Sequence, residues 1–476
     1  MTLIFSNHRF QYEVERLFRN FINEPGIKLS TDKADAQGDF CLTEKVEYPG
    51  GAELSVDLVR EGKRFCMSRS IPGGMPEKEQ ERELCILLYK ALREYTGRDL
   101  PWGILTGVRP VKVLSKLTDA QAFQSLLVSP RKLAVSRRIE QVQKPLADSI
   151  PENSFSLYVS IPFCPTRCSY CSFVSHSVNS AAARLDEYLG RMMEEMRQLS
   201  TISRHLGLVP DTIYFGGGTP TVLSAEQLKM LFSALECFDL SHIREFTVEA
   251  GRPDSITREK LMAIREYPVT RISVNPQTMN QETLDIIGRR HTVEQTKEAF
   301  HLARELGYDN INMHLIVGLP GEDIHMVERT LEQVRELAPD SITVHSLAVK
   351  RAARLNIFKE KYQEMSFENN QEIMDLTMKT AYEMGMGPYY LYRQKNMKGN
   401  FENVGYAKVD KAGIYNILIM EEKQPIIALG AGGSSKLVFD HGQRIERVEN
   451  VKDVSNYISR IDEMIERKRT AIATWL

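Results

Sequence analysis

The sequence lacks the features that would carry a protein into or across a membrane. It has no apolar run as long as the roughly 18 residues of a spanning helix, and its N-terminus alternates apolar and charged side chains instead of forming a signal peptide. It also lacks an excess of either charge: the formal net charge is −2, which excludes a broad attraction to nucleic acid or anionic lipid. We therefore expect a cytoplasmic protein with no membrane span and no nucleic-acid partner.

Cysteine is also scarce, with 7 residues in a chain of 476. An odd number does not suit a disulfide framework. Four of the cysteines are scattered, whereas Cys164, Cys168 and Cys171 fall within one short segment. In a cytosolic chain such a cluster indicates a metal-binding or catalytic site.

The length predicts two or three domains. The first, residues 1–150, has an α+β pattern, with a hairpin over residues 54–68 and a helix over 76–95. The second, residues 151–350, alternates strands and helices. The third, residues 351–476, is predicted to be a mixed α/β extension that covers the substrate.

Six strands are predicted in the second domain, each followed by a helical pattern. They are residues 157–161, 212–215, 246–250, 271–275, 311–317 and 342–347. Such βα units in series imply a parallel sheet with right-handed crossovers. Periodicity alone leaves open a doubly wound sheet and a partial barrel.

The three clustered cysteines follow the first of these strands, with the spacing C-x3-C-x2-C. Thiolates are the ligands that iron–sulfur clusters need, and Cys164, Cys168 and Cys171 could each bind a different iron of a cubane. The fourth iron would lack a protein ligand and could bind a cofactor directly, as an open catalytic zinc site does. Two alternatives stay open: a zinc site with His176 as the fourth ligand, and three unrelated buried cysteines.

This spacing, with Tyr170 before the last cysteine, resembles the radical S-adenosylmethionine (SAM) superfamily. Further strand ends resemble its motifs in the same order: Gly216-Gly-Gly-Thr-Pro220, Glu249, Arg271 to Gln277, and Gly288-Arg-Arg-His291. The resemblance implies a partial (β/α)6 barrel, a 4Fe–4S cluster on the three cysteines, and SAM bound to the open iron. It implies SAM contacts at Tyr158, Tyr170, Gly217, Gly218, Thr219, Glu249, Gln277, Arg289, His314 and Ala348.

The motifs Tyr158-x-x-Ile-Pro-Phe-Cys164 and Ile287-Gly-Arg-Arg-His-Thr292 are similar to those of the branch that contains oxygen-independent coproporphyrinogen III oxidase. The resemblance implies an oxidoreductase of haem biosynthesis. Such an enzyme turns two propionates of coproporphyrinogen III into vinyl groups, giving protoporphyrinogen IX, with an electron donor of the reduced flavodoxin or ferredoxin type. Candidates to meet the substrate are Arg167, Arg290, Arg393 and Lys395 for its carboxylates, and Tyr389, Tyr390 and Tyr392 for its macrocycle, although core packing explains these tyrosines equally well.

Three positions depart from the oxidase branch. Ser160 stands where the oxidases have histidine, Phe173 where they have a fourth cysteine, and His314 where the branch usually has aspartate. The ending Cys171-x-Phe173 is closer to the haem-chaperone branch, which binds haem and SAM. The sequence therefore leaves two other functions open: a haem-binding transfer protein, and a radical SAM reaction on another tetrapyrrole.

Overall fold

The protein forms two compact units. The computed structural model describes residues 1–22, 24–172, 176–350, 353–362, 365–367, 369–394 and 401–475, without the side chains of 179–183, 359 and 441. The first unit holds Met1–Glu140 with Arg393 and Phe401, and the second holds Gln141–Tyr392 and Glu402–Leu476. Two predicted parts, 151–350 and 351–476, thus lie largely in one unit.

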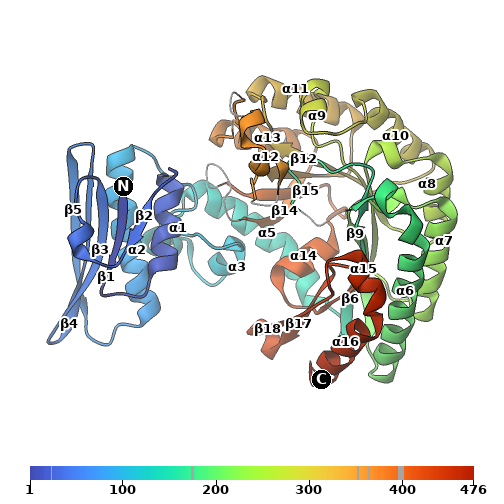
Figure 1. The fold of residues 1–476 in the computed structure, drawn as a ribbon, viewed down its shortest axis with the longest axis horizontal. Coiled ribbons are helices and arrows are strands. Elements are labelled where there is room, and N and C mark those ends of the chain that lie inside the picture. The colour runs from blue at the N-terminus through green and yellow to red at the C-terminus, as the bar shows by residue number, and fades with distance from the viewer. Residues whose placement is uncertain are drawn as a thin grey trace. The chain divides into compact units, whose positions relative to one another are not determined.

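The first unit is an α+β sandwich of one sheet and two long helices. Its strands lie in the order β2-β1-β3-β4-β5, with bounds β1 Thr2–Ser6, β2 Lys28–Ser30, β3 Phe40–Tyr48, β4 Gly51–Arg60 and β5 Lys63–Pro72. Helices α1 (Gln11–Phe21) and α2 (Glu77–Thr96) pack side by side against the sheet (Figure 1). Both the predicted hairpin and the predicted helix are confirmed, and α2 ends at Gly97 with φ +66°, a left-handed cap that suits glycine. Three further helices follow: α3 Pro110–Leu114, α4 Asp119–Leu126 and α5 Pro130–Asp148.

The second unit is built on one sheet of 11 strands, in the order β14-β15-β13-β12-β11-β10-β9-β6-β16-β17-β18. The six predicted strands are confirmed as neighbouring parallel strands at its centre. Their bounds are β6 Ser154–Ile161, β9 Val209–Gly217, β10 Glu245–Gly251, β11 Arg271–Val274, β12 Ile311–Val317 and β13 Ser341–Ser346. Consecutive parallel strands joined by helices are the plan of a partial (β/α)6 barrel.

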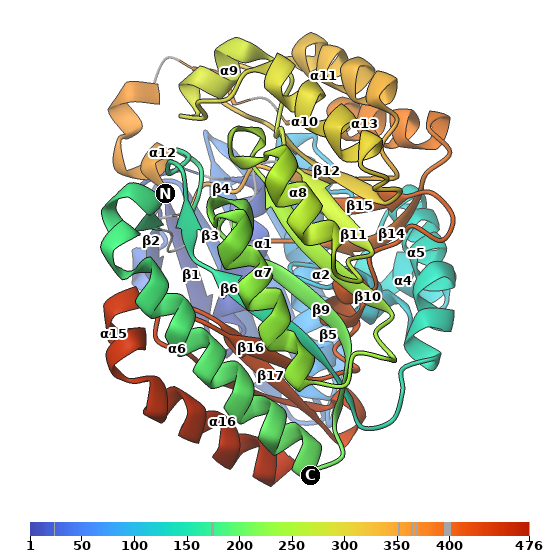
Figure 2. The ribbon, with the colours of Figure 1, turned by 90° about the vertical axis from the view of Figure 1, so that its right-hand side faces the viewer.

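Helices between these strands cover the outer face of the sheet, as Figure 2 shows for α6, α7 and α8. The helices are α6 Val178–His205, α7 Ala225–Ala234, α8 Arg258–Arg265, α9 Gln281–Ile286, α10 Val293–Glu305 and α11 Ile324–Leu337. The sequence of α11 shows why a helix forms there. The side chain of Asp323 caps its first turn by accepting a hydrogen bond from the N–H of Met326, and Val327, Leu331 and Val334 form one buried face.

The C-terminal segments extend the barrel sheet at both edges. At one edge β15 (Asn403–Ala407) joins β13 and β14 (Gly387–Tyr392) joins β15, both antiparallel. At the other edge β16 (Ile426–Leu429) runs parallel to β6, followed by β17 (Ser434–Phe439) and β18 (Arg444–Glu449). The accompanying helices are α12 Arg354–Ile357, α13 Gln371–Glu383, α14 Ile414–Glu421, α15 Val454–Ser459 and α16 Ile461–Trp475. Among the described residues, no helix is long and apolar enough to cross a bilayer.

Candidate active site

The sequence motifs come together because parallel strands end at the same rim of a barrel. Cys164 ends the short strand β7 (Phe163–Cys164) just after β6, and Gly217 ends β9. Glu249 lies near the end of β10, Gln277 follows β11, and Ala348 follows β13. These predicted motifs therefore lie at or near the carboxyl ends of barrel strands, whereas Gly288-Arg-Arg-His291 lies in the turn between α9 and α10.

The glycine motif after β9 lies directly against the cysteine loop. The N–H of Gly218 donates to the carbonyl of Ile161 and that of Thr219 to the carbonyl of Phe163, each over 2.8 Å. A Cβ on Gly218 would stand 2.4 Å from the Phe163 oxygen, so only glycine allows this approach. The Thr219 hydroxyl in turn donates to the sulfur of Cys164 over 3.6 Å.

Backbone contacts also hold the cysteine loop from its other side. Ser169 donates its N–H to the carbonyl of Ile287 over 2.9 Å and accepts one from Leu355 over 2.9 Å. The hydroxyl of Thr166 donates to the carbonyl of Gly288 over 3.1 Å. The three thiols are therefore presented by a loop that is fixed on both sides, with Cys168 buried and the other two half-buried.

The three thiols do not converge on a single metal ion. In the part of the chain that the structure describes, no three His, Cys, Asp or Glu side chains stand close enough to share one metal ion. In a cubane each cysteine binds a different iron, so the sulfurs stand farther apart than the ligands of a single ion. The geometry thus gives the zinc alternative no support. Phe173, which marks the departure after the third cysteine, lies outside the described residues.

Unpaired buried polar atoms beside the loop fit a polar ligand. Arg289 donates to the carbonyls of Asn275 and Pro276 through one terminal nitrogen. Its Nε, the Oδ1 of Asn275 and the Oγ of Ser169 are buried and have no hydrogen-bond partner among the described residues. Buried polar atoms are usually paired, so a bound polar molecule such as SAM would account for these three.

Gln277 has a strained backbone that the sequence did not reveal. Its φ is +72°, a left-handed conformation that side chains other than glycine rarely adopt. Strand β12 holds this segment in place. The N–H of Gln277 donates to the backbone carbonyl of His314, and the carbonyl of Gln277 accepts from the N–H of Ile316. Strain held in place by such contacts is typical of functional positions.

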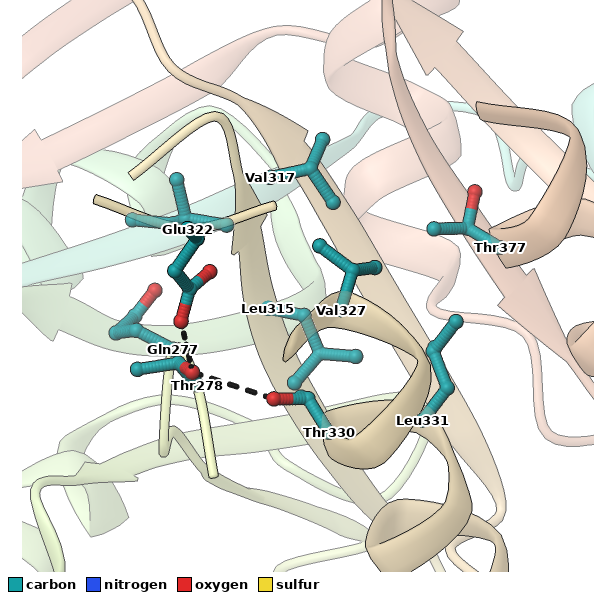
Figure 3. A pocket seen from close by; sticks show the side chains of 10 residues that line it. Gln277, Thr278, Leu315, Val317, Glu322, Val327, Thr330, Leu331 and Thr377 are labelled. Carbon is teal, nitrogen blue, oxygen red and sulfur yellow. Dashed lines mark hydrogen bonds between the residues drawn. The ribbon is translucent and has the colours of Figure 1, made fainter. Parts of the chain in front are cut away.

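A small cavity of about 10 Å³ lies behind Gln277. Figure 3 shows the Thr278 hydroxyl between the carboxylate of Glu322 and the hydroxyl of Thr330. Asn280 also donates to Glu322, over 3.0 Å, and burial raises the pKa of this carboxyl. The cavity has the volume of about one water molecule, so this network supports the segment that carries Gln277 and is not itself a cofactor pocket.

Tyrosine rings surround the half-buried Glu249. Tyr214 donates its hydroxyl to the carboxylate, and burial raises the pKa of Glu249 although this hydrogen bond opposes the rise. Tyr214 stacks on Tyr158 at 6.1 Å and on Tyr415 at 4.5 Å between ring centroids. Tyr415 comes from α14 and was not predicted, because no local signal links it to the barrel strands.

His314, the histidine that departs from the pattern of the resembled branch, lies against a second histidine. The rings of His314 on β12 and His345 on β13 lie 5.3 Å apart, edge to face, and Tyr392 lies 3.4 Å from the Nδ1 of His345. Burial, and then the charge of His345, hold the pKa of His314 well below its usual value. Burial lowers the pKa of His345 to about 4. Both imidazoles are therefore neutral near pH 7. His345 was not among the site residues predicted from the sequence.

The glycine-rich turn after β16 also reaches the site. The Ser160 hydroxyl donates to the carbonyl of Ala431 over 3.0 Å. Tyr188 donates to the carbonyl of Ser160 over 2.8 Å and accepts the N–H of Ala431 over 3.0 Å. Because β16 and β6 are parallel, their ends share one rim; this long-range pairing is invisible to local patterns.

The predicted substrate-binding residues are not all at this rim. Arg167 is half-buried in the cysteine loop, and Arg290 is exposed. Arg393 lies in the first unit, where its guanidinium donates to the carbonyl of Leu105 and stands 6.0 Å from the Trp102 ring. Tyr389 and Tyr390 pack in a buried cluster with Ala407 and Ile417, as the alternative explanation predicted. Lys395 lies outside the described residues.

Comparisons with known proteins agree with this site. Residues 158–334 match the Radical SAM superfamily. The chain is 40% identical over 407 residues to the "Oxygen-independent coproporphyrinogen-III oxidase-like protein HemZ" of Bacillus subtilis, covering 82% of this chain and 81% of that one. It is 32% identical to the "Heme chaperone HemW" of B. subtilis, over 65% of this chain and 76% of that one.

The structure of coproporphyrinogen III oxidase (HemN) from Escherichia coli matches with a TM-score of 0.53 at 23% identity, over 68% of this chain and 73% of that one. This likeness shows the fold. A radical SAM protein uses a 4Fe–4S cluster and SAM, and these are the cofactors of this chain. The chain belongs to the radical SAM superfamily and, within it, to the family of oxygen-independent coproporphyrinogen III oxidase-like proteins.

Proposed function

We propose that this chain catalyses the oxidative decarboxylation of coproporphyrinogen III to protoporphyrinogen IX. Each of two propionates would give one hydrogen atom to the 5′-deoxyadenosyl radical and one electron to an external one-electron acceptor, lose carbon dioxide, and become a vinyl group. The observation that carries the proposal is a cluster of three tyrosines on the barrel strands and α14: Tyr158, Tyr214 and Tyr415 stack on one another, and Tyr214 donates to Glu249. Aromatic faces suit a large, mostly apolar macrocycle.

Cys164, Cys168 and Cys171 would hold the cluster in this proposal. SAM would lie against the rim, in contact with Tyr158, Tyr170, Gly217, Gly218, Thr219, Glu249, Gln277, Arg289, His314 and Ala348. When bound, the two cofactors supply a 5′-deoxyadenosyl radical that removes a hydrogen atom from the substrate. The protein's own part is to bind, orient and shield the reactants.

Ser160 is compatible with this reaction although the oxidases have histidine there. Its hydroxyl is engaged with the carbonyl of Ala431, so position 160 offers no acid or base to the barrel interior. The proposed step removes hydrogen as an atom and the carboxylate as carbon dioxide, so it needs no protein base at that point. The electron donor would be a reduced flavodoxin or ferredoxin in the cytosol.

A haem-binding chaperone is the second candidate function. It is favoured by the 32% identity to a protein named as a heme chaperone, together with Ser160 and the Cys171-x-Phe173 ending. Such a protein would hold haem and transfer it without decarboxylating coproporphyrinogen III.

One anaerobic incubation separates the two candidates. The cluster-loaded chain is mixed with SAM, dithionite and coproporphyrinogen III, and the products are followed by mass spectrometry. The proposal predicts loss of two carbon dioxide molecules per substrate, matched by 5′-deoxyadenosine, in the wild type and not in Cys168→Ala. Tight haem binding with no decarboxylated product would favour the chaperone, and another modified tetrapyrrole would point to a different reaction.

A further inference from the structure

A buried arginine contacts the cysteine loop and forms an ion pair with a more exposed aspartate. Arg252, in the turn after β10, is only 2% exposed. Its Nε and Nη2 bind the two carboxylate oxygens of Asp254 at 2.9 and 2.7 Å. Its remaining nitrogen, Nη1, donates to the carbonyl of Thr166 at 3.1 Å and to its hydroxyl at 2.6 Å.

The pair is oriented with its positive end toward the cysteines. Thr166 lies between Cys164 and Cys168 in the chain, so Nη1 contacts the loop itself, while Asp254 binds the other two nitrogens of the guanidinium. Burial by itself lowers the pKa of Arg252, but Asp254 and the thiols of Cys168 and Cys164 more than offset this and raise it. Arg252 therefore stays charged beside the cysteine loop.

A cation in this place acts on the redox state of a cluster. Reduction adds one negative charge to the 4Fe–4S centre, and a nearby buried positive charge stabilises the reduced form more than the oxidised one. Groups outside the ligand set tune metal centres in this way. We infer that Arg252 is a positioning residue that raises the reduction potential of the cluster, and that Asp254 limits this rise.

Substitutions in the two partners should shift the potential in opposite directions. The measurement is an EPR-monitored redox titration of the anaerobically reconstituted full-length chain, without substrate. Arg252→Gln should make the midpoint potential more negative, and Asp254→Asn should make it more positive. A tenfold change in the reduced-to-oxidised ratio corresponds to about 59 mV for a one-electron couple, and we expect shifts of about this size.

Shifts of opposite sign in the two variants distinguish an electrostatic effect from damage to the cysteine loop, because damage would not depend on the sign of the charge removed. Arg258→Gln is the matched control, because Arg258 lies nearby in the chain but pairs with Glu305 at the surface. The cluster of this variant should have the same midpoint potential as that of the wild type. Iron and sulfide analysis checks that each variant holds a full cluster. If Arg252→Gln does not hold a cluster, Arg252→Lys, which keeps the positive charge, should hold one with a midpoint potential near that of the wild type. The shift in Asp254→Asn can be measured independently of either variant.

Unchanged potentials, or shifts of the same sign in Arg252→Gln and Asp254→Asn, would overturn the inference. It rests on the proposed assignment of the three cysteines and not on the proposed substrate. A wild-type chain that holds no cluster would therefore overturn both, whereas a cluster of unchanged potential would overturn the inference alone.

Discussion

At the scale of single residues, His314 is the clearest change in the candidate SAM site. Its ring has no hydrogen-bond partner among the described residues and is neutral near pH 7. If it contacts SAM, His314→Ala should weaken SAM binding about tenfold, which corresponds to the loss of one good hydrogen bond. Because its pKa is well below its usual value, the fold difference in affinity between wild type and His314→Ala should be the same at pH 6 and pH 8. The α-amino group of SAM titrates at about pH 8 and changes both affinities alike.

Calorimetric titration of SAM into the cluster-loaded chain measures both effects. His301→Ala is the control, since His301 is exposed on α10. A fold difference between wild type and His314→Ala that changes sharply below pH 7, or equal affinities in the two proteins, would show that His314 does not make this contact.

Glu322, behind Gln277, gives a second prediction at this scale. Burial raises the pKa of its carboxyl, so its contribution to stability is full at low pH and is lost as the pH rises through the raised value. Glu322→Gln keeps an oxygen for Thr278 and Asn280 but carries no charge. The stability of this variant relative to wild type should therefore be higher at pH 8 than at pH 5, as measured by urea unfolding.

Glu322→Leu removes the acceptor altogether. Thr278 and Asn280 would then lose a buried partner, at a cost of about 1–3 kcal/mol in unfolding free energy. For Glu322→Gln, a difference in unfolding free energy from the wild type that is the same at pH 5 and pH 8 would mean that folding does not change the pKa of the Glu322 carboxyl.

At the scale of elements, the approach of the β9 loop to the cysteine loop depends on Gly218. An added Cβ would lie 2.4 Å from the carbonyl oxygen of Phe163 and 2.9 Å from that of Ile161, and neither backbone atom can give way easily. Gly218→Ala should therefore lower cluster loading, measured as iron per chain. Gly190→Ala is the control: that glycine has open space around its Cβ position within α6, and alanine there should add about 0.5–1 kcal/mol of stability. Equal loading in both variants would be evidence against close packing of the two loops.

A buried ion pair ties the last helix to the first barrel helix. Lys468 of α16 donates to Glu195 of α6 over 2.5 Å, with side chains 2% and 1% exposed, and α16 lies alongside α6 in Figure 2. Glu195 also accepts the N–H of Gly430, so the pair supports the glycine-rich turn. Lys468→Met should leave the buried carboxylate without its cation, although Gly430, Asn450 and Tyr457 still donate to it, and should cost about 3–5 kcal/mol.

Denaturant unfolding of Lys468→Met compared with Arg469→Ala tests this contribution. Arg469 forms an exposed pair with Glu466, so its loss should cost no more than about 1 kcal/mol. Similar losses in the two variants would show that the buried pair adds little.

The same elements show what a sequence can predict. The six barrel strands and the helices between them have strong local patterns, and the motifs lie next to them in the chain, so this part of the fold and the cysteine loop were predicted. The pairing of β16 with β6 joins segments about 270 residues apart and leaves no local pattern. Tyr415 and His345 reach the site only through such packing. Arg252 lies three residues after Glu249 in the chain, but only the structure shows its contacts with Asp254 and Thr166.

At the scale of the whole molecule, the proposed chemistry depends on a 4Fe–4S cluster held by three cysteines with SAM beside it. The decisive measurement is the EPR spectrum of the anaerobically reconstituted and reduced full-length chain, recorded with and without SAM. We predict a full cluster whose spectrum changes when SAM is added, and the loss of that cluster in Cys164→Ala, Cys168→Ala and Cys171→Ala but not in the control Cys237→Ala. A cluster that survives these three substitutions, or a wild-type spectrum that SAM does not alter, would contradict the proposed site.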